Sequence, residues 1–407
     1  MRKDFGSILQ SFREASTIIL YSGGFFVAKK IAWGTGAGLL FLLLMFWYRK
    51  PLVIPVSLFY DSGDPADAVV SRQAHQSVVL AMEFFNTRST SRFFVPFRET
   101  DLDLVASVER AVERSSAAVV GGINAPFALQ LSGALKRHGL PFLSLSSAAS
   151  LALPNDLVFR PRPGDGAREL GIAARKMGIS SYSVIVSGFD SSRVQEFIRG
   201  FEMQAGMPPR RTMVFSGDLN KHIEDFERIA RGMDAILLVL PDWPAAVAIR
   251  ELRLRLPHLP VFTSNWAISH RTHLLAGALG EGAITTSFTP EEWDQRENEF
   301  VRFVSDTYGA DIPPLILAMG YDTVALLDEA VRRAGSAAPH AVARALEELE
   351  HVNTAGGTVP MNENGDMQRP ASLFTLSAGG WIRISDPETV SLSSKPGIFG
   401  RLSREEL

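Results

Sequence analysis

The chain has 407 residues, a net charge of −3 and no cysteine. The lack of cysteine excludes disulfides, thiolate zinc sites and cysteine nucleophiles, and the small net charge gives no electrostatic case for nucleic-acid binding. With 46% hydrophobic and 21% charged residues, the sequence predicts a folded globular chain, and its length favours two domains.

An uncharged run at residues 31–48 ends in LLFLLLMFWY and lies between the basic pairs Lys29–Lys30 and Arg49–Lys50. This length and these flanks favour a transmembrane anchor over a buried core helix. No small-residue cleavage site follows, so we expect an uncleaved signal-anchor. More basic residues precede the span than follow it closely, which places the N-terminus inside and the large domain outside.

After the anchor, the apolar periodicity predicts strands that alternate with helices. In the first half of the chain, the expected strands are 52–59, 93–97, 117–120, 141–145 and 157–159. The expected helices run from the turn at 61–65 to about residue 88, over 102–114, and from 127 to 139.

The stretch 117–150 predicts a strand, a turn, a helix, a second strand and a serine-rich loop. Asn124 followed by Pro126 is typical of a helix N-cap and a first-turn proline. Two strands joined by a helix form a parallel pair, and ligands of open parallel sheets bind beyond the carboxyl ends of the strands. The N–H groups of the turn at 121–126 and the hydroxyls within 144–150 therefore predict a site for a small anion or carboxylate.

A second alternation follows in the second half of the chain. Its expected strands are 182–187, 212–215, 235–240 and 261–263, and its expected helices are 167–177, 192–205, 219–231 and 245–254. Residues 291–350 are expected to be mostly helical, and short strands are expected at 356–361, 372–376 and 381–384. Two such sets predict an α/β chain with two doubly wound, parallel-sheet lobes and a cleft between them.

Six local motifs follow one another in an order that resembles type I periplasmic binding proteins, specifically the leucine/isoleucine/valine-binding branch. They are VVGG at 119–122, GLPFLSLSSAAS at 139–150, VFRPRPGD at 158–165, SYSVIVSGFDSS at 181–192, GYDTVALLDEAVRRAGS at 320–336 and NTAGGTVPMNENGDMQRPASLFTL at 353–376. The resemblance covers about residues 52–384. It implies two hinged lobes that close on a small polar ligand, often an amino acid, and deliver it to an ABC transporter.

The anchor and the resemblance together give the expected organisation of the chain. It comprises a cytoplasmic segment 1–30, the anchor 31–48, lobe 1 at 52–161 and 286–371, lobe 2 at 162–285 and 372–390, and a tail 391–407. A single-pass protein of the bacterial inner membrane is expected, with its large domain in the periplasm. A tethered receptor gains from local concentration near its partner.

In the first lobe, the resemblance implies ligand contacts in two turns. The family's serine-bearing turn is matched by Ala125 and Pro126, so only the backbone N–H groups of that turn remain. The family's alanine–threonine pair is matched by Ser147 and Ala148, and Ser146 precedes it.

In the second lobe, the implied positions carry other residue types than the family has. Arg193 stands where the family has an aromatic residue, and Asn265 falls near its ammonium-binding acid. Another cleft aromatic of the family falls near Asp242. An uncharged Asn265 cannot pair with an ammonium as a carboxylate can, while Arg193 favours an anion. The expected ligand-binding residues are Gly122, Asn124, Ala125, Ser146, Ser147, Arg193, Asp242 and Asn265.

Enzymatic chemistry is not predicted. His270 and His273 lack a third metal ligand nearby, and neither a dinucleotide fingerprint nor a G-x-S-x-G elbow occurs. We therefore expect no cofactor, no metal and no nucleic-acid partner. The expected partners are an unidentified small molecule, the membrane through the N-terminal helix, and a transporter or another envelope protein.

Two other interpretations stay open. The chain could be a structural or interaction protein of the cell envelope that kept the fold and lost the ligand, as Pro126, Ala148, Arg193 and Asn265 would suggest. The other, an intracellular enzyme with an apolar N-terminal helix, is disfavoured by the anchor and by the absence of a catalytic motif.

Overall fold

The computed structural model describes residues 51–385, apart from 61–64, 101–102, 147–150, 152–155, 162–165, 188–190, 216–218, 289–298, 310–311, 355–356 and 370. From residue 53 on, the described residues belong to one compact unit. The predicted anchor at 31–48, the segment 1–30 and the tail 391–407 lie outside the described residues. Within the described residues, no helix has both the length and the apolar character that crossing a membrane requires.

The first five strands form one sheet, called sheet 1 here, in the order β2-β1-β3-β4-β5. Its strands are β1 (Leu52–Tyr60), β2 (Arg92–Thr100), β3 (Ala118–Gly121), β4 (Phe142–Ser144) and β5 (Val158–Phe159). β3 pairs in parallel with both β1 and β4, which confirms the predicted parallel crossover through residues 117–145.

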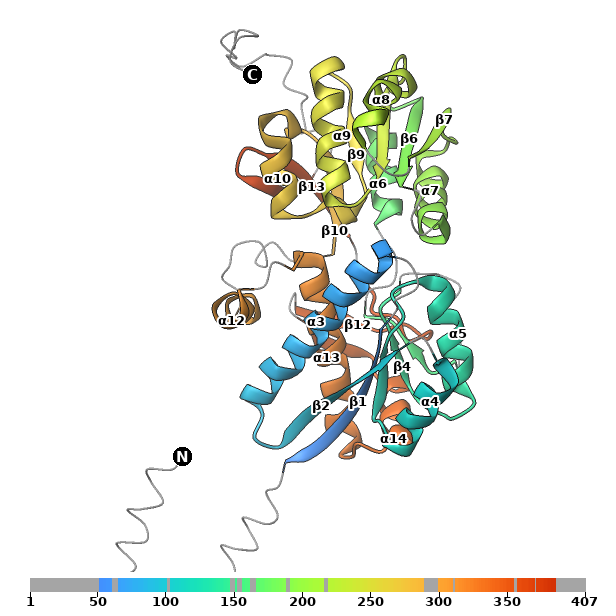
Figure 1. The fold of residues 1–407 in the computed structure, drawn as a ribbon, viewed down its shortest axis with the longest axis vertical. Coiled ribbons are helices and arrows are strands. Elements are labelled where there is room, and N and C mark those ends of the chain that lie inside the picture. Colours follow the sequence, from blue (N-terminus) through green and yellow to red (C-terminus); the bar gives the residue numbers. More distant parts are fainter. Residues whose placement is uncertain are drawn as a thin grey trace, which may run out of the picture. The chain divides into compact units, whose positions relative to one another are not determined.

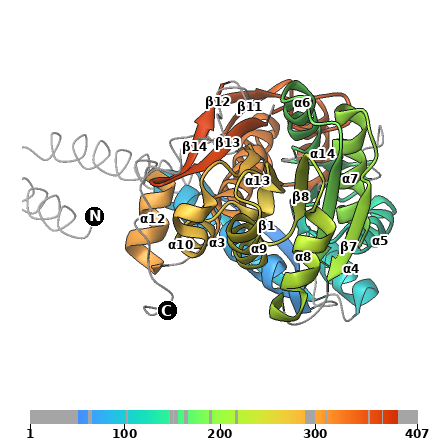
Figure 2. The ribbon, with the colours of Figure 1, turned by 90° about the horizontal axis from the view of Figure 1, so that it is seen from above.

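Helices lie on both faces of sheet 1 (Figure 1). They are α3 (Pro65–Arg88), α4 (Leu104–Glu113), α5 (Ala125–Lys136), α12 (Glu299–Tyr308), α13 (Pro314–Ala334) and α14 (Pro339–Glu347). α4 and α5 bury apolar residues against Phe59, Val119 and Phe142. α3 and α13 run side by side, as Figures 1 and 2 show, and the hydroxyl of Ser77 donates to the carbonyl of Ile316.

The second sheet, called sheet 2, has the order β14-β13-β10-β9-β8-β6-β7. Its strands are β6 (Tyr182–Ser187), β7 (Arg211–Phe215), β8 (Ala235–Val239), β9 (Val261–Thr263), β10 (Ile284–Ser287), β13 (Ser372–Ser377) and β14 (Gly380–Ile384). Five of these strands are parallel, whereas β13 and β14 run antiparallel to their neighbours. The predicted parallel sheet is confirmed for these five strands, and the short strands predicted near the end of the chain add an antiparallel edge to it.

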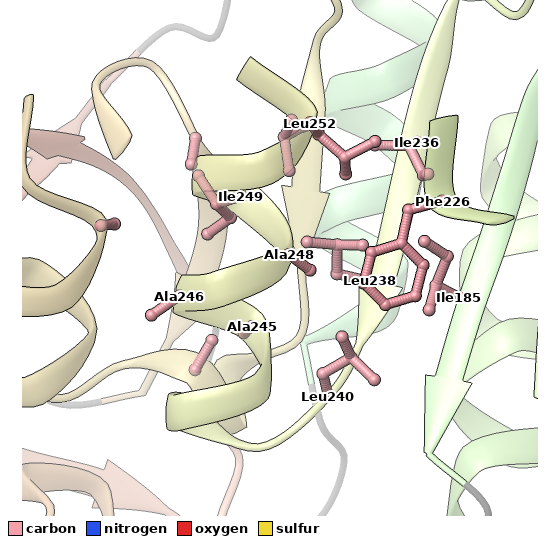
Figure 3. Packing of buried hydrophobic residues seen from close by; sticks show 14 of the residues in the cluster. Ile185, Phe226, Ile236, Leu238, Leu240, Ala245, Ala246, Ala248, Ile249 and Leu252 are labelled. Carbon is pink, nitrogen blue, oxygen red and sulfur yellow. The ribbon is translucent and has the colours of Figure 1, made fainter. Parts of the chain in front are cut away.

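The central strands β8, β9 and β10 of sheet 2 are buried on both faces. Its helical segments are α6 (Ala167–Lys176), α7 (Ser191–Ala205), η3 (Leu219–His222), α8 (Ile223–Ala230), α9 (Asp242–Arg255), η4 (Asn265–Ala267), α10 (His270–Ala276) and η5 (Gly277–Gly280). Successive residues of a strand point to opposite faces. Ile236 and Leu238 accordingly pack under α8 and α9 (Figure 3), while Leu237 packs with α6 and α7.

Later in the chain, after α14 and before β13, β11 (His351–Thr354) and β12 (Gly357–Pro360) form a two-stranded antiparallel sheet. The turn that follows is bound to the end of β5. Arg160 donates two hydrogen bonds, of 2.6 and 2.7 Å, to the carboxylate of Asp366, and both side chains are buried. This pair ties together segments more than 200 residues apart.

Candidate ligand-binding site

The turn after β3 has a geometry that only glycine permits. Gly122 has φ +63°, and an added Cβ would lie 2.9 Å from the Cβ of Ala128 and 3.0 Å from the ring of Phe142. Gly121 lies opposite Ser144 across the β3–β4 pair, and its carbonyl accepts a 2.9 Å hydrogen bond from the N–H of Leu145. The turn after β3 and the loop after β4 are therefore neighbours at the carboxyl edge of sheet 1, as predicted.

The side chain of Asn124 caps helix α5. Its Oδ1 accepts from the N–H of Phe127 at 3.3 Å, and Ala125 is the buried first residue of the helix. This confirms the predicted N-cap and commits the Asn124 oxygen to the helix. The groups left for a ligand at this turn are backbone N–H groups, which carry the positive end of the helix dipole.

The serine-rich loop after β4 is only partly described. Ser144 and Ser146 are both buried, and the Ser144 hydroxyl accepts from the N–H of Ser146 at 3.2 Å. The Ser144 hydroxyl thus stabilises the local turn through a hydrogen bond to the backbone. The predicted contact Ser147 lies outside the described residues.

Three neighbouring strands of sheet 2 lead to the predicted contacts on that side. β8 lies between β6 and β9, with Val239 opposite Val186 and Leu238 opposite Thr263. Arg193, Asp242 and Asn265 follow β6, β8 and β9 respectively, so all three come after the carboxyl ends of adjacent parallel strands. Arg193 lies in the first turn of α7; its side chain is outside the described part of the chain.

The carboxylate of Asp242 serves local structure. Its Oδ1 accepts from the N–H of Trp243 at 2.7 Å, and its Oδ2 accepts from the hydroxyl of Ser269 at 3.1 Å. The hydroxyl of Thr272 also donates to the Asp242 carbonyl, at 3.4 Å. These bonds join the start of α9 to the start of α10, a helix that the sequence interpretation missed.

Asn265 differs from the other predicted residues in its hydrogen bonding. It is only 3% exposed, yet its Oδ1 has no hydrogen-bond partner among the described residues. A buried, unsatisfied amide oxygen costs about 1–3 kcal/mol of folding free energy. In native proteins such a group usually has a partner, which can be a protein group, a bound water or a ligand.

A second unsatisfied polar group lies beside sheet 1. β1 ends at Tyr60, next to the turn after β3, and the ring of His75 on α3 meets the Tyr60 ring edge-on at 6.3 Å. The Nε2 atom of His75 is buried and has no hydrogen-bond partner among the described residues. A lone histidine in a long helix gave no sequence signal, because only the fold brings it to Tyr60.

His75 should make the stability of the protein depend on pH. Burial, and secondarily the positive charge of Arg98, lower the pKa of His75 from 6.5 to about 4. Between these values the unfolded state binds the proton and the folded state does not, so stability is full above pH 6.5 and falls as the pH drops towards 4. We expect a loss of about 2 kcal/mol between pH 8 and pH 5 from this group.

Urea unfolding of wild type and of His75→Gln at both pH values measures this contribution. The variant should lose about 2 kcal/mol less than wild type on acidification, because glutamine does not titrate. Gln76→Ala, at the adjacent exposed position, is the control and should keep the wild-type pH dependence. Equal pH dependence in wild type and His75→Gln would contradict the prediction.

Among the described residues, no group of three His, Asp or Glu side chains is placed to hold a metal ion. His273 and its neighbours on α10 therefore offer no metal site in this part of the chain.

Comparison with known proteins tests the resemblance to periplasmic binding proteins. Residues 229–380 match the sequence model of a family described as periplasmic binding protein. A search of the curated proteins found no match.

Solved structures similar to the chain cover about four fifths of its length. The solute-binding protein of an R. palustris ABC transporter, in complex with benzoate, has a TM-score of 0.67 at 15% identity and covers 82% of this chain and 96% of its own. The leucine-binding protein LivK of Thermotoga maritima has a TM-score of 0.64 at 18% identity, covering 83% and 100%. LivJ of Streptococcus pneumoniae, in complex with isoleucine, has a TM-score of 0.63 at 14% identity, covering 82% and 100%.

At identities of 14–18%, these structures show the fold of the chain alone. The strand order, the two sheets and the family match over residues 229–380 agree with one another. The resemblance of this chain to periplasmic binding proteins is therefore confirmed over residues 229–380, and the chain has the α/β fold of the leucine- and isoleucine-binding proteins among these structures.

Proposed function

We propose that the chain is a solute-binding or receptor protein that works outside the cytoplasm and closes on a small ligand, for an ABC-type transporter or a sensor. In this proposal, sheets 1 and 2 are the cores of two hinged lobes, with boundaries at 52–161 and 286–371 for lobe 1 and at 162–285 and 372–390 for lobe 2. Ligand contacts in both lobes favour the closed state over the open one, and a partner protein binds the closed and open states with different affinities.

The observation that carries the proposal is the unsatisfied Oδ1 of Asn265. It lies where a parallel strand of sheet 2 ends, which is where ligands of such sheets bind. A ligand that places an N–H or O–H donor against this oxygen makes the missing hydrogen bond, and the cost of the unsatisfied acceptor is then removed in the bound state. The backbone N–H groups at 122–125 are the matching groups on sheet 1.

The ligand class follows from the charges. The ligands named for the similar structures are benzoate, 3,4-dihydroxybenzoic acid, leucine and isoleucine, which all carry a carboxylate. A helix N-terminus suits that group. Asn265 supplies no negative charge for an ammonium, and Arg193 would favour an anion. We therefore rank small carboxylates that lack an α-ammonium but carry an N–H or O–H donor for the Asn265 Oδ1, hydroxybenzoic acids included, above α-amino acids.

The test is thermal unfolding of the protein with a panel of benzoates, aliphatic carboxylates, amides and amino acids. A ligand that binds only the folded state stabilises it by about 2.7 kcal/mol at a hundredfold excess over Kd. Asn265→Ala should abolish most of this ligand-dependent shift. Without ligand it should keep wild-type stability or gain slightly, because the unsatisfied amide is gone.

Asn86→Ala is the matched control. The Asn86 amide bonds the N–H and the carbonyl of Phe94 at 2.7 and 2.9 Å, so its loss should lower stability and leave the ligand shift intact. A folded protein that no panel compound stabilises would refute the receptor and favour the structural protein of the envelope that uses the same fold. In that case Asn265→Ala and Arg193→Ala would leave assembly unchanged.

A further inference from the structure

The amino-terminal edge of sheet 1 exposes an apolar surface, the edge opposite to the one with the proposed ligand contacts. Val53 near the start of β1 is 55% exposed, and Phe93 near the start of β2 is 46% exposed. β1 and β2 are neighbours in the sheet, and Figure 1 shows both strands starting at the same end.

Helix α4 leaves these two residues uncovered. Alternate residues of a strand share a face, so Phe93 lies on the same face as Phe97 and Glu99. Glu99 is held by Arg110 of α4 and by Arg114, and the Arg114 guanidinium lies 4.8 Å from the centre of the Phe97 ring. Helix α4 and the Arg114 side chain therefore cover the strand as far as Phe97. Phe93 lies about 13 Å from Phe97, towards the start of the strand.

Val53 belongs to the same face of the sheet. It is six residues before Phe59, whose side chain packs against Val108 and Ala111 of α4. It also precedes Val56, the first residue of β1 that pairs with β3. Val53 and Phe93 are thus two exposed apolar residues near the amino-terminal ends of neighbouring strands, called the edge pair here.

The sequence before the edge pair points to a membrane as its partner. The predicted anchor ends at Tyr48, and the five peptide units from Tyr48 to Val53 reach at most about 18 Å. Arg49 and Lys50 lie within this link, and anionic lipid attracts such residues by about 1 kcal/mol each. An exposed valine and phenylalanine held this close to a bilayer fit its interfacial region.

We propose that the edge pair rests on the outer surface of the membrane, with Phe93 at the level of the lipid headgroups. The inference depends on the proposed anchor. It fixes the orientation of sheet 1: β1 has nine residues, so the carboxyl edge with Gly122 and Ser146 stands about 30 Å from the bilayer. The proposed ligand contacts then face away from the membrane, and the lobe containing sheet 2 stays free to move.

The absence of cysteine allows a direct test in the full-length chain. Single variants Phe93→Cys and Val105→Cys are labelled with an environment-sensitive fluorophore and reconstituted into bilayers with nitroxide-labelled headgroups. Val105 is 65% exposed at the start of α4, near the carboxyl edge, and is the matched control. We expect loss of fluorescence at position 93 and none at position 105.

Flotation of the full-length chain with liposomes, in buffer that strips peripheral proteins, tests the anchor separately. A chain that floats, with equal quenching at both positions, overturns the edge contact and leaves the anchor standing. A blue-shifted label at position 93 without lipid quenching also overturns it, since a protein would then cover the edge pair. A chain that does not float overturns the anchor, and the edge contact with it.

Discussion

Replacing Asp366 by alanine is expected to lower the free energy of unfolding by about 3–5 kcal/mol. Asp366 and Arg160 are each 4% exposed and form two hydrogen bonds, of 2.6 and 2.7 Å. Without the carboxylate, the buried Arg160 guanidinium loses both of these hydrogen bonds and the negative charge that faces it. The N–H of Asp366 also binds Asn362 Oδ1 at 2.8 Å and keeps that bond, so within the turn only the long 3.4 Å bond from Asn362 Nδ2 to Asp366 Oδ2 is lost besides the ion pair.

Urea unfolding measures this change, and Glu348→Ala is the matched control. Glu348 pairs with Arg344 on α14, but their side chains are 62% and 80% exposed, so the loss should be below about 1 kcal/mol. A double variant with Arg160→Met and Asp366→Leu should recover most of the stability, because buried ion pairs are often replaceable by apolar residues. If Asp366→Ala costs no more than Glu348→Ala, the pair does not bear on stability.

The elements that the sequence predicted best are those with strong local signals. β6 and β9 have the predicted bounds, and α5 has the predicted cap, because apolar runs and an Asn-x-Pro start are local features. β10, with the sequence ITTS, was missed because its four residues contain only one strongly apolar side chain and form no apolar run. Their hydroxyls donate to the carbonyls of Thr263 and Gly166, partners that only the folded chain brings near.

The candidate site shows the same division. The sequence pointed to the correct loops, since loops at the carboxyl ends of parallel strands follow from strand order. It could not show how each side chain is used. Asn124 and Asp242 make local capping bonds, whereas Asn265 is left unsatisfied. Which polar group is already satisfied depends on contacts distant in sequence, and the same holds for His75 against Tyr60.

Gly320→Ala is expected to destabilise the protein by about 2–3 kcal/mol, at the upper end of the cost of overpacking. Gly320 lies where α13 meets α3. An added Cβ would fall 2.1 Å from the Oγ of Ser77 and 2.6 Å from its backbone carbonyl carbon. The Ser77 hydroxyl, which donates to the carbonyls of Ile316 and Leu317 at 2.8 and 3.2 Å, would also be displaced. The two longest helices beside sheet 1 would have to separate.

Gly133→Ala separates this packing effect from helix propensity. Gly133 lies on the exposed face of α5, and an added Cβ there meets nothing within 4 Å. Alanine should therefore stabilise that helix by up to about 1 kcal/mol, so the same substitution in two helices should act with opposite signs. Ser77→Gly should not rescue Gly320→Ala, because the backbone carbon of residue 77 still blocks the methyl group. Rescue by Ser77→Gly would mean that the hydroxyl, and not the approach of the two helix backbones, sets the spacing of α3 and α13.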